Sequence, residues 1–223
     1  DYLHAKDRYN PEFLPRPFFI EITGTPSAGK TTTIKELDKF LRRKGFRVWM
    51  PQEGAEVIRH ISRTTPLYNL RTCLYALAHL IDEAQGHKYD IVMFDRCIFD
   101  AYCWMMYWEE KGRLSIEEKS IFQAFALSHY WASLIDAAYF MTTDPQVAGE
   151  RETRIALSKE LGETTSPDSV RKLVARYKTA FDELSPTHPQ LRMLDTTYIS
   201  EADMVRQVST EIIDILEAKT HRP

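Results

Sequence analysis

Apolar residues along the chain fall into two alternating patterns, short continuous runs and longer stretches with helical spacing. The short runs are rich in β-branched and aromatic residues, and they predict buried strands at 18–23, 46–50, 91–94, 137–141 and 191–194. Apolar residues at intervals of three or four predict helices at 31–44, 66–87, 98–111, 116–134, 145–161, 168–184 and 201–218. Such alternation indicates right-handed βαβ crossovers and a mostly parallel sheet.

Several single residues refine these boundaries. Gly45 is placed to end the first helix, and Asp168 is expected to be the N-cap of the helix over 168–184. Residues 162–167 are expected to form a loop. In the helix over 66–87, the predicted buried stripe consists of Leu70, Leu74, Leu77 and Ile81.

No repeat and no linker divides the chain, so we expect one α/β domain over residues 18–223. Its predicted architecture has three layers, with a five-stranded, mostly parallel sheet covered by helices on both faces. The prolines before residue 18 predict an irregular arm over residues 1–17. Ligands bind beyond the carboxyl ends of such strands, so the site should be formed by the loops after Thr23, Met50, Phe94, Met141 and Leu194.

Composition and charge exclude several classes of protein. Hydrophobic residues make up 43% of the 223 residues, which excludes disorder as the main state. The net charge of −3 argues against a protein that mainly grips duplex DNA over a basic face. Three cysteines without a C-x-x-C pair predict reduced thiols in a cytoplasmic protein. No apolar run is long enough to span a bilayer and no signal peptide is visible, so no membrane partner is expected.

The sharpest motif is G-x-x-x-x-G-K-[ST], which runs from Gly24 to Thr31 between a predicted strand and a predicted helix. The glycines let the backbone curl so that its N–H groups face a phosphate, and the helix start adds further donors. The residues expected to bind the phosphates are Gly24, Thr25, Pro26, Ser27, Ala28, Gly29, Lys30, Thr31 and Thr32.

The same motif brings a cation and a metal ligand to the phosphates. Lys30 is predicted to reach the β- and γ-phosphates, and the Thr31 hydroxyl to bind Mg²⁺. Asp95 ends the third predicted strand, where a carboxylate can hold Mg²⁺ directly or through water. We therefore expect a triphosphate bound together with Mg²⁺.

The phosphate loop, the Asp95-Arg96 pair and the arginines after the fourth strand resemble those of P-loop nucleoside and nucleotide kinases, especially deoxynucleoside and thymidylate kinases. The resemblance implies that Asp95 serves the metal or the substrate and that Arg96 clamps a phosphoryl group. It also implies a general base just past the second strand, where Glu53 is the first choice and Glu56 the second. Pro26 and Ser27 stand where many thymidylate kinases carry an acidic residue.

The resemblance also implies a lid around residues 145–165, in which Arg151 and Arg154 close over ATP and Lys159 contributes weakly. Arginine suits this role because its planar fork grips phosphate oxygens in pairs. The alternative is a solvated helix face on which these arginines pair with Glu150 and Glu152. The loop over residues 195–198 would pack near adenine.

The acceptor side is implied only as a region of the chain. The residues there are Arg59, Arg63, Tyr68, Arg71, Tyr75, Asp100, Tyr102, Trp104 and Gln123. The resulting hypothesis is an ATP- and Mg²⁺-dependent kinase acting on a nucleoside or a nucleoside monophosphate. The alternatives are a P-loop NTPase switch or sensor and a kinase acting on a nucleic-acid end or a nucleobase. The helices between Ile98 and Leu134 would either pack between the subunits of a homodimer or cover their own sheet.

Overall fold

The computed structural model describes residues 16–155 and 166–220. Its five strands form one parallel sheet in the order β2-β3-β1-β4-β5. The strands are β1 (Phe18–Gly24), β2 (Val48–Trp49), β3 (Ile91–Asp95), β4 (Ile135–Thr142) and β5 (Leu191–Asp195). The predicted α/β class and parallel sheet are confirmed, although β2 is shorter than the predicted run of residues 46–50.

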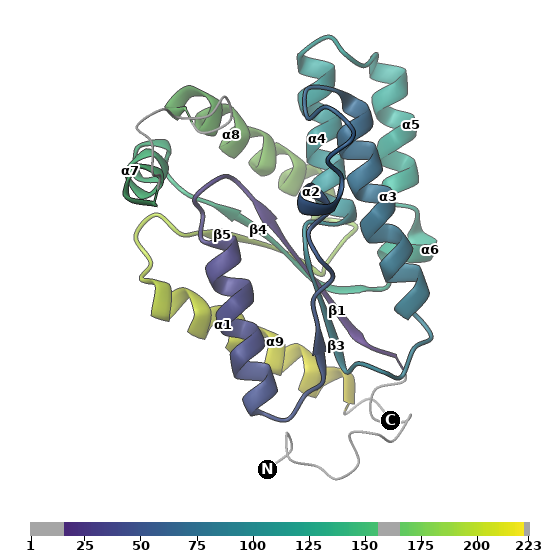
Figure 1. The fold of residues 1–223 in the computed structure, drawn as a ribbon, viewed down its shortest axis with the longest axis vertical. Coiled ribbons are helices and arrows are strands. Elements are labelled where there is room, and N and C mark those ends of the chain that lie inside the picture. The colour runs from purple at the N-terminus through teal and green to yellow at the C-terminus, as the bar shows by residue number, and fades with distance from the viewer. Residues whose placement is uncertain (1–15, 156–165, 221–223) are drawn as a thin grey trace.

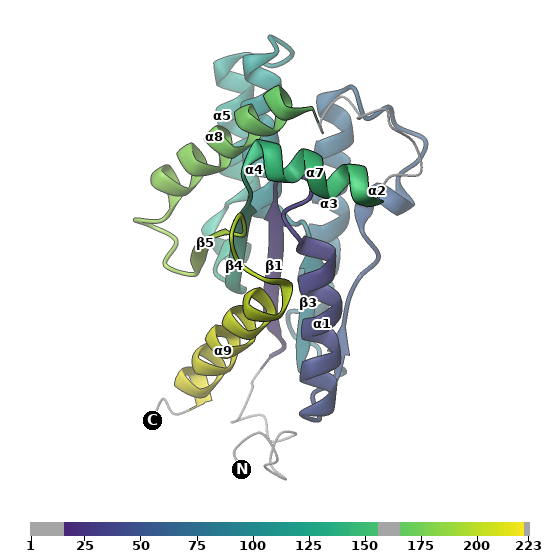
Figure 2. The same cartoon turned by 90° about the vertical axis from the view of Figure 1, so that its left-hand side faces the viewer.

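Helices cover both faces of the sheet, so the domain has three layers (Figures 1 and 2). The longer helices are α1 (Lys30–Arg43), α3 (Pro66–Glu83), α4 (Ile98–Glu110), α5 (Ile116–Ala126), α7 (Pro145–Ile155), α8 (Pro167–Leu184) and α9 (Glu201–Thr220). Two short helices complete the described part, α2 (Gly54–Val57) and α6 (His129–Ala132). The alternating pattern predicted from apolar spacing is therefore present.

Two apolar clusters hold these layers together, one on each face of the sheet. Ile20 and Ile22 of β1 pack toward α1 and α9, against residues such as Leu37 and Ile212. Phe19 of the same strand points to the opposite face, where α3, α4 and α8 contribute Leu80, Phe99, Tyr177 and others. Side chains alternate across a strand, so β1 supplies both cores and is buried along its whole length.

Two predicted details are corrected and one is confirmed. The helix expected over 116–134 ends at Ala126, because Ser128 is extended and the Trp131 indole N–H donates to the Ala126 carbonyl at 2.9 Å. Ser166, not Asp168, is the N-cap of α8, and its hydroxyl accepts from the Ser169 N–H at 3.3 Å. The Gly45 prediction is confirmed, because this residue has φ of 89° and directly follows the last turn of α1.

The predicted buried stripe of α3 is also wrong in part. Leu74 and Ile81 are 40% and 49% exposed, whereas Leu77 is buried. The helix instead turns Cys73, Ala76, Leu77 and Leu80 inward. Cys73 and Ala76 belong to the same buried cluster as Phe99 and Cys103 of α4, whereas Leu74 and Ile81 stay outside it. Residues 1–15 of the expected arm and 156–165 of the expected lid lie outside the described residues.

Candidate active site

The phosphate loop joins the end of β1 to the start of α1. Gly24 has φ of 141°, and a Cβ built there would lie 1.8 Å from the Met141 carbonyl oxygen of β4. The Thr25 N–H donates to the same carbonyl at 2.9 Å, which fixes the base of the loop against the sheet. Gly29 has φ of 88°, so both motif glycines adopt conformations that favour glycine.

Lys30 begins α1 and lies folded under the loop. Its ammonium group donates to the Thr25 carbonyl at 2.7 Å, and the residue is 8% exposed. Burial, reinforced by the Arg96 charge, lowers the pKa of Lys30 to about 8, although Asp95 and Asp100 act in the opposite direction. A bound phosphate would therefore offer the Lys30 ammonium a negatively charged partner in place of the Thr25 carbonyl.

Asp95 is placed beside the loop because β3 and β1 are neighbours and Ile22 pairs with Asp95 in the register. One of its carboxylate oxygens, Oδ1, is buried and has no hydrogen-bond partner among the described residues. Burial raises the pKa of Asp95. An orphaned carboxylate oxygen at a phosphate loop fits Mg²⁺, which uses few protein ligands and keeps water and phosphate oxygens. Thr31 is exposed on the first turn of α1, so its hydroxyl is available as the second expected ligand.

Arg96 lies between two carboxylates at the carboxyl end of β3. Its Nε is 3.2 Å from Glu53 Oε1, and its Nη1 is 3.5 Å from Asp100 Oδ1. The same Asp100 oxygen accepts from the Tyr177 hydroxyl at 2.8 Å and from the Thr23 hydroxyl. Arg96 is therefore held directly by Glu53 and Asp100, and Asp100 is in turn held by Thr23 of β1 and Tyr177 of α8.

The structure separates the two candidates for the general base. Glu53 directly precedes α2, is half-buried and contacts Arg96. Burial and the nearby Asp95 carboxylate raise the pKa of Glu53. Glu56 is exposed and accepts from the Gln52 side chain at 3.1 Å. Glu53 thus contacts Arg96 directly, whereas Glu56 acts on this pair only as a charge near Asp95.

A buried carboxylate that we did not predict supports this arrangement. Glu21 lies in the middle of β1 with no exposure, and it accepts backbone N–H groups from Cys97, Phe99 and Asp100 at 2.8, 3.1 and 2.9 Å. Burial raises the pKa of Glu21 to about 7. A lone acidic residue inside an otherwise apolar strand was the available sequence signal, because such a group must find donors.

The arginine expected to lie over ATP contacts the phosphate loop itself. Arg151 donates to the Ser27 carbonyl at 3.1 Å and to the Thr196 carbonyl at 2.8 Å. Glu152 accepts from the Ser27 hydroxyl at 2.7 Å rather than pairing with Arg151. Arg154 belongs to α7, but its side chain and all of Lys159 lie outside the described residues. Arg151 therefore joins α7, the phosphate loop and the loop after β5, the loop expected near adenine.

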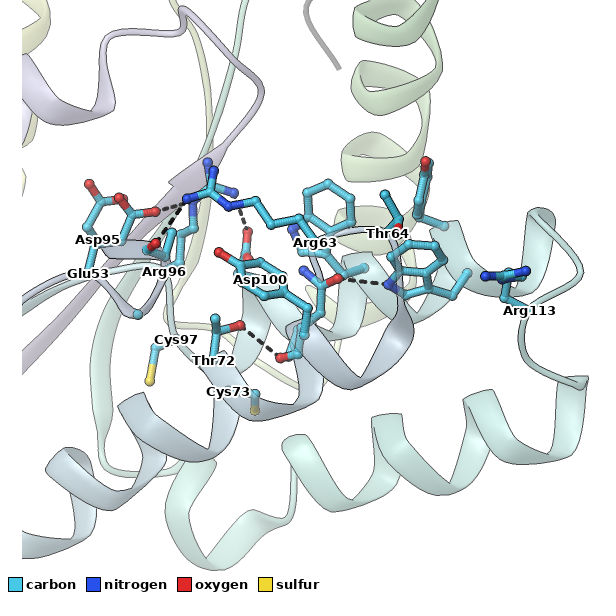
Figure 3. Close-up of a pocket in the computed structure, with 18 of the residues that line it drawn as sticks. Glu53, Arg63, Thr64, Thr72, Cys73, Asp95, Arg96, Cys97, Asp100 and Arg113 are labelled. Carbon is cyan, nitrogen blue, oxygen red and sulfur yellow. Dashed lines mark hydrogen bonds and ion pairs between the residues drawn. The ribbon is translucent and has the colours of Figure 1, made fainter. Parts of the chain in front are cut away.

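A cavity of about 520 Å³ opens beside Asp95 and Arg96, between α3 and α4 (Figure 3). Of the residues expected on the acceptor side, four line this cavity, namely Arg63, Tyr68, Asp100 and Trp104. The others do not line it: Arg59, Arg71, Tyr75, Tyr102 and Gln123. Sequence reasoning missed further lining residues, among them Asn69, Thr72, Tyr107, Trp108, Lys111 and Arg113. The periodic aromatic residues of α4 were the signal that could have identified several of these residues.

The part of the chain described by the structure has neither a clustered metal-ligand site nor a membrane-spanning helix. No group of three or more His, Cys, Asp or Glu residues is arranged to hold a metal ion there. A phosphate-loop magnesium site needs only one carboxylate and one hydroxyl from the protein, so the site described above does not depend on such a group. None of the described helices is long and apolar enough to cross a membrane.

Comparison with known proteins places the chain in a family. Residues 19–160 match the AAA domain family, and this segment holds the phosphate loop, Glu53 and the Asp95-Arg96 pair. The chain is also 32% identical over 148 residues to a thymidylate kinase of Geobacillus thermodenitrificans (strain NG80-2). That alignment covers 60% of this chain and 63% of the relative, so the chain spans less than two thirds of the relative's length. The expected resemblance to P-loop nucleotide kinases is therefore confirmed, and the chain belongs to the AAA domain family.

Proposed function

We propose that this protein transfers the γ-phosphoryl group of ATP, bound with Mg²⁺, to a nucleoside or a nucleoside monophosphate. The observation that carries this proposal is the Glu53–Arg96 ion pair, which lines a cavity large enough for a second substrate beside the Asp95 carboxylate. A site that only hydrolyses a nucleotide needs room for one water molecule beside the γ-phosphate and no cavity for a second substrate. A cavity of about 520 Å³ that reaches the same carboxylate suits a second substrate.

In the proposed reaction, the bond between the γ-phosphorus and its bridging oxygen breaks while a bond from the acceptor oxygen forms. Lys30 and Arg96 would stabilise the charge on the transferring group, which is the main task of the protein in phosphoryl transfer. When the acceptor is a hydroxyl, Glu53 would accept its proton. Mg²⁺, which Asp95 and Thr31 would hold, supplies further charge neutralisation at the phosphates.

The carboxylate assigned as base suits this work. Burial and Asp95 already raise the pKa of Glu53, so it is a stronger base than an exposed glutamate. Its contact with Arg96 keeps it oriented toward the transfer centre. The similarity to a thymidylate kinase supports a nucleotide-like acceptor. Because Pro26 and Ser27 replace an expected acidic residue, we leave both nucleosides and monophosphates as acceptors.

The proposal is tested with γ-labelled ATP, Mg²⁺ and a panel of nucleosides, nucleoside monophosphates and 5′-hydroxyl oligonucleotides. We expect label transfer to at least one small acceptor, and a loss of at least a hundredfold in Lys30→Ala. Lys35→Ala, on the exposed face of the same helix, is the matched control and should retain activity. Release of phosphate without transfer would instead identify an NTPase switch, and transfer to oligonucleotides alone would identify a nucleic-acid end kinase. Full activity of Lys30→Ala would refute the proposed role of the loop.

A further inference from the structure

The cavity follows one face of α4 from end to end. The α4 segment lines it with residues spaced three or four apart, which are Cys97, Asp100, Ala101, Trp104, Tyr107, Trp108 and Lys111. These residues run from the N-cap of the helix to its C-cap, with 13 helical residues between them. A rise of 1.5 Å per residue makes this wall about 20 Å long. A single nucleoside is shorter than this, so an acceptor held at Glu53 leaves the outer end unfilled.

The two ends of the cavity differ in charge. The inner end holds the carboxylates of Glu53, Asp95 and Asp100 around Arg96, whereas Lys111 and Arg113 lie at the outer end. Figure 3 shows Arg113 at the opposite side of the lining from Glu53 and Asp95. The inner carboxylates face the position proposed for Mg²⁺ and ATP.

The outer cations have no carboxylate partner in residues 16–155 and 166–220. No ion pair includes Lys111 or Arg113, and the Lys111 ammonium lies over the Tyr107 ring at 5.5 Å. The nearby acidic residues are already engaged, because Glu109 is 3.5 Å from Lys119 and Glu110 accepts from Arg176 Nε at 3.1 Å. The outer end therefore carries positive charge that is not neutralised from within the described protein.

The turn after α4 explains why Arg113 lines the cavity. Gly112 has φ of 64°, and the Arg113 N–H donates back to the Trp108 carbonyl at 2.8 Å. This turn folds residue 113 back over the helix end instead of continuing away from it. The helix dipole alone favours a cation near Lys111. The dipole does not explain why Arg113, which follows the turn at Gly112, also lines this cavity.

We propose that the outer end of this cavity binds a carboxylate or phosphate group of the acceptor. This anionic group lies at the opposite end of the acceptor from the group that receives the phosphoryl. The inference rests on the proposed function, because it assumes that the acceptor occupies the cavity. Arg113 suits an oxyanion because its guanidinium group donates two parallel hydrogen bonds. Trp104 and Trp108 line the path between the two ends and offer flat apolar surfaces for a ring of the acceptor.

Pairs of acceptors that differ only in charge test this inference. One pair is uridine with a C5 alkyl chain that is long enough to span the cavity wall and ends in a carboxylate, together with its methyl ester. The other pair is uridine with the same chain ending in a phosphate, together with its neutral dimethyl ester. For each pair we would measure kcat/KM for transfer, and the binding affinity from quenching of tryptophan fluorescence. The variants are Arg113→Gln, Arg113→Lys as the charge-retaining variant, and Arg206→Gln as a control on the exposed side of α9.

We expect the wild-type protein to prefer the anionic member of at least one pair by about tenfold, the scale of one exposed charge-assisted contact. Arg113→Gln should abolish that preference, whereas Arg113→Lys and Arg206→Gln should keep most of it. The pair that shows the preference identifies phosphate or carboxylate as the source. The inference is overturned if neither pair shows a preference, or if Arg113→Gln leaves the preference unchanged. Failure of transfer with a persisting, Arg113-dependent binding preference would refute the proposed function alone.

Discussion

Replacing Tyr177 by phenylalanine tests whether the buried contacts behind Arg96 position it for phosphoryl transfer. Tyr177 belongs to α8, and its hydroxyl donates to Asp100 Oδ1 at 2.8 Å. The Asp100 carboxylate in turn contacts Arg96 Nη1 at 3.5 Å. Burial raises the pKa of Tyr177 further above its ordinary value, so this hydroxyl stays protonated and donates at every working pH. The substitution removes one donor and leaves the ring packed on Phe140.

The two effects of the substitution can be scaled separately. A buried hydrogen bond to a carboxylate contributes about 1.5–3 kcal/mol, so the free energy of unfolding should fall by roughly that amount. Asp100 keeps its Thr23 donor and gains freedom to move, which displaces Arg96 from the transfer centre. We expect kcat to fall by about tenfold, equivalent to about 1.4 kcal/mol of barrier. KM for ATP should change little, because Tyr177 does not touch the phosphate loop residues that bind it.

Tyr139→Phe provides the matched control. Tyr139 is also buried, and its hydroxyl donates to a carboxylate, Glu211 Oε2, at 3.1 Å on the other face of the sheet. Urea unfolding should therefore register a loss of stability in both variants. Steady-state kinetics should register a fall in kcat only for Tyr177→Phe. Equal kcat values in the two variants, with the stability loss present, would refute the positioning argument.

Three further predictions concern ionisation and backbone shape. Lys30 has a pKa of about 8, which bound phosphates should raise, so ATP affinity should fall as the pH rises above 8. Calorimetry near pH 8.5 in buffers of different ionisation enthalpy should detect proton uptake, and Lys30→Arg should remove it. Glu21 has a pKa of about 7 against 4.5 unfolded, so its stabilisation is complete below about pH 4.5 and lost as the pH rises through 7. Urea unfolding at pH 5 and 8 should show a loss of about 2.5 kcal/mol that Glu21→Gln abolishes. Gly24→Ala should destabilise by more than about 4 kcal/mol because of the Met141 carbonyl, whereas Gly112→Ala, which meets nothing within 4 Å, should lose about 1 kcal/mol in the same assay.

The fold was predictable where one physical signal dominates. Continuous apolar runs fixed the strands, because a sheet covered on both faces leaves no polar alternative for their residues. Helix ends and buried helix faces were less predictable, because two alternative arrangements of the same residues bury a similar apolar area. Apolar spacing in α3 fits both the stripe through Leu74 and Ile81 and the face with Cys73 and Leu80, and only the folded chain shows that the second face joins the core with α4. The end of α5 depended on one extended residue, Ser128, and on the Trp131 hydrogen bond.

The site divides in the same way. The phosphate loop and Asp95 follow from short motifs, since their chemistry is carried by adjacent residues or by a strand end. The residues behind Arg96 come from separate segments, so no local spacing reveals them. Asp100 and Tyr177 are 77 positions apart, and only the folded chain joins them. The outer end of the cavity was equally hidden, because the turn at Gly112 determines where Arg113 lies.

Arg96 occupies a strained backbone position at the carboxyl end of β3, although it is not a glycine. It has φ of 69°, a left-handed conformation that glycine would adopt without penalty and that strains other residues by about 1 kcal/mol or more. Its N–H donates to the Ile22 carbonyl at 3.0 Å, and Glu21 binds the next N–H groups along the chain, so the strained backbone is held from both sides. Glycine here would relieve the strain and lose the guanidinium. The chain keeps this backbone strain in order to hold a guanidinium group at the edge of the cavity. This supports the role of Arg96 in the proposed transfer step.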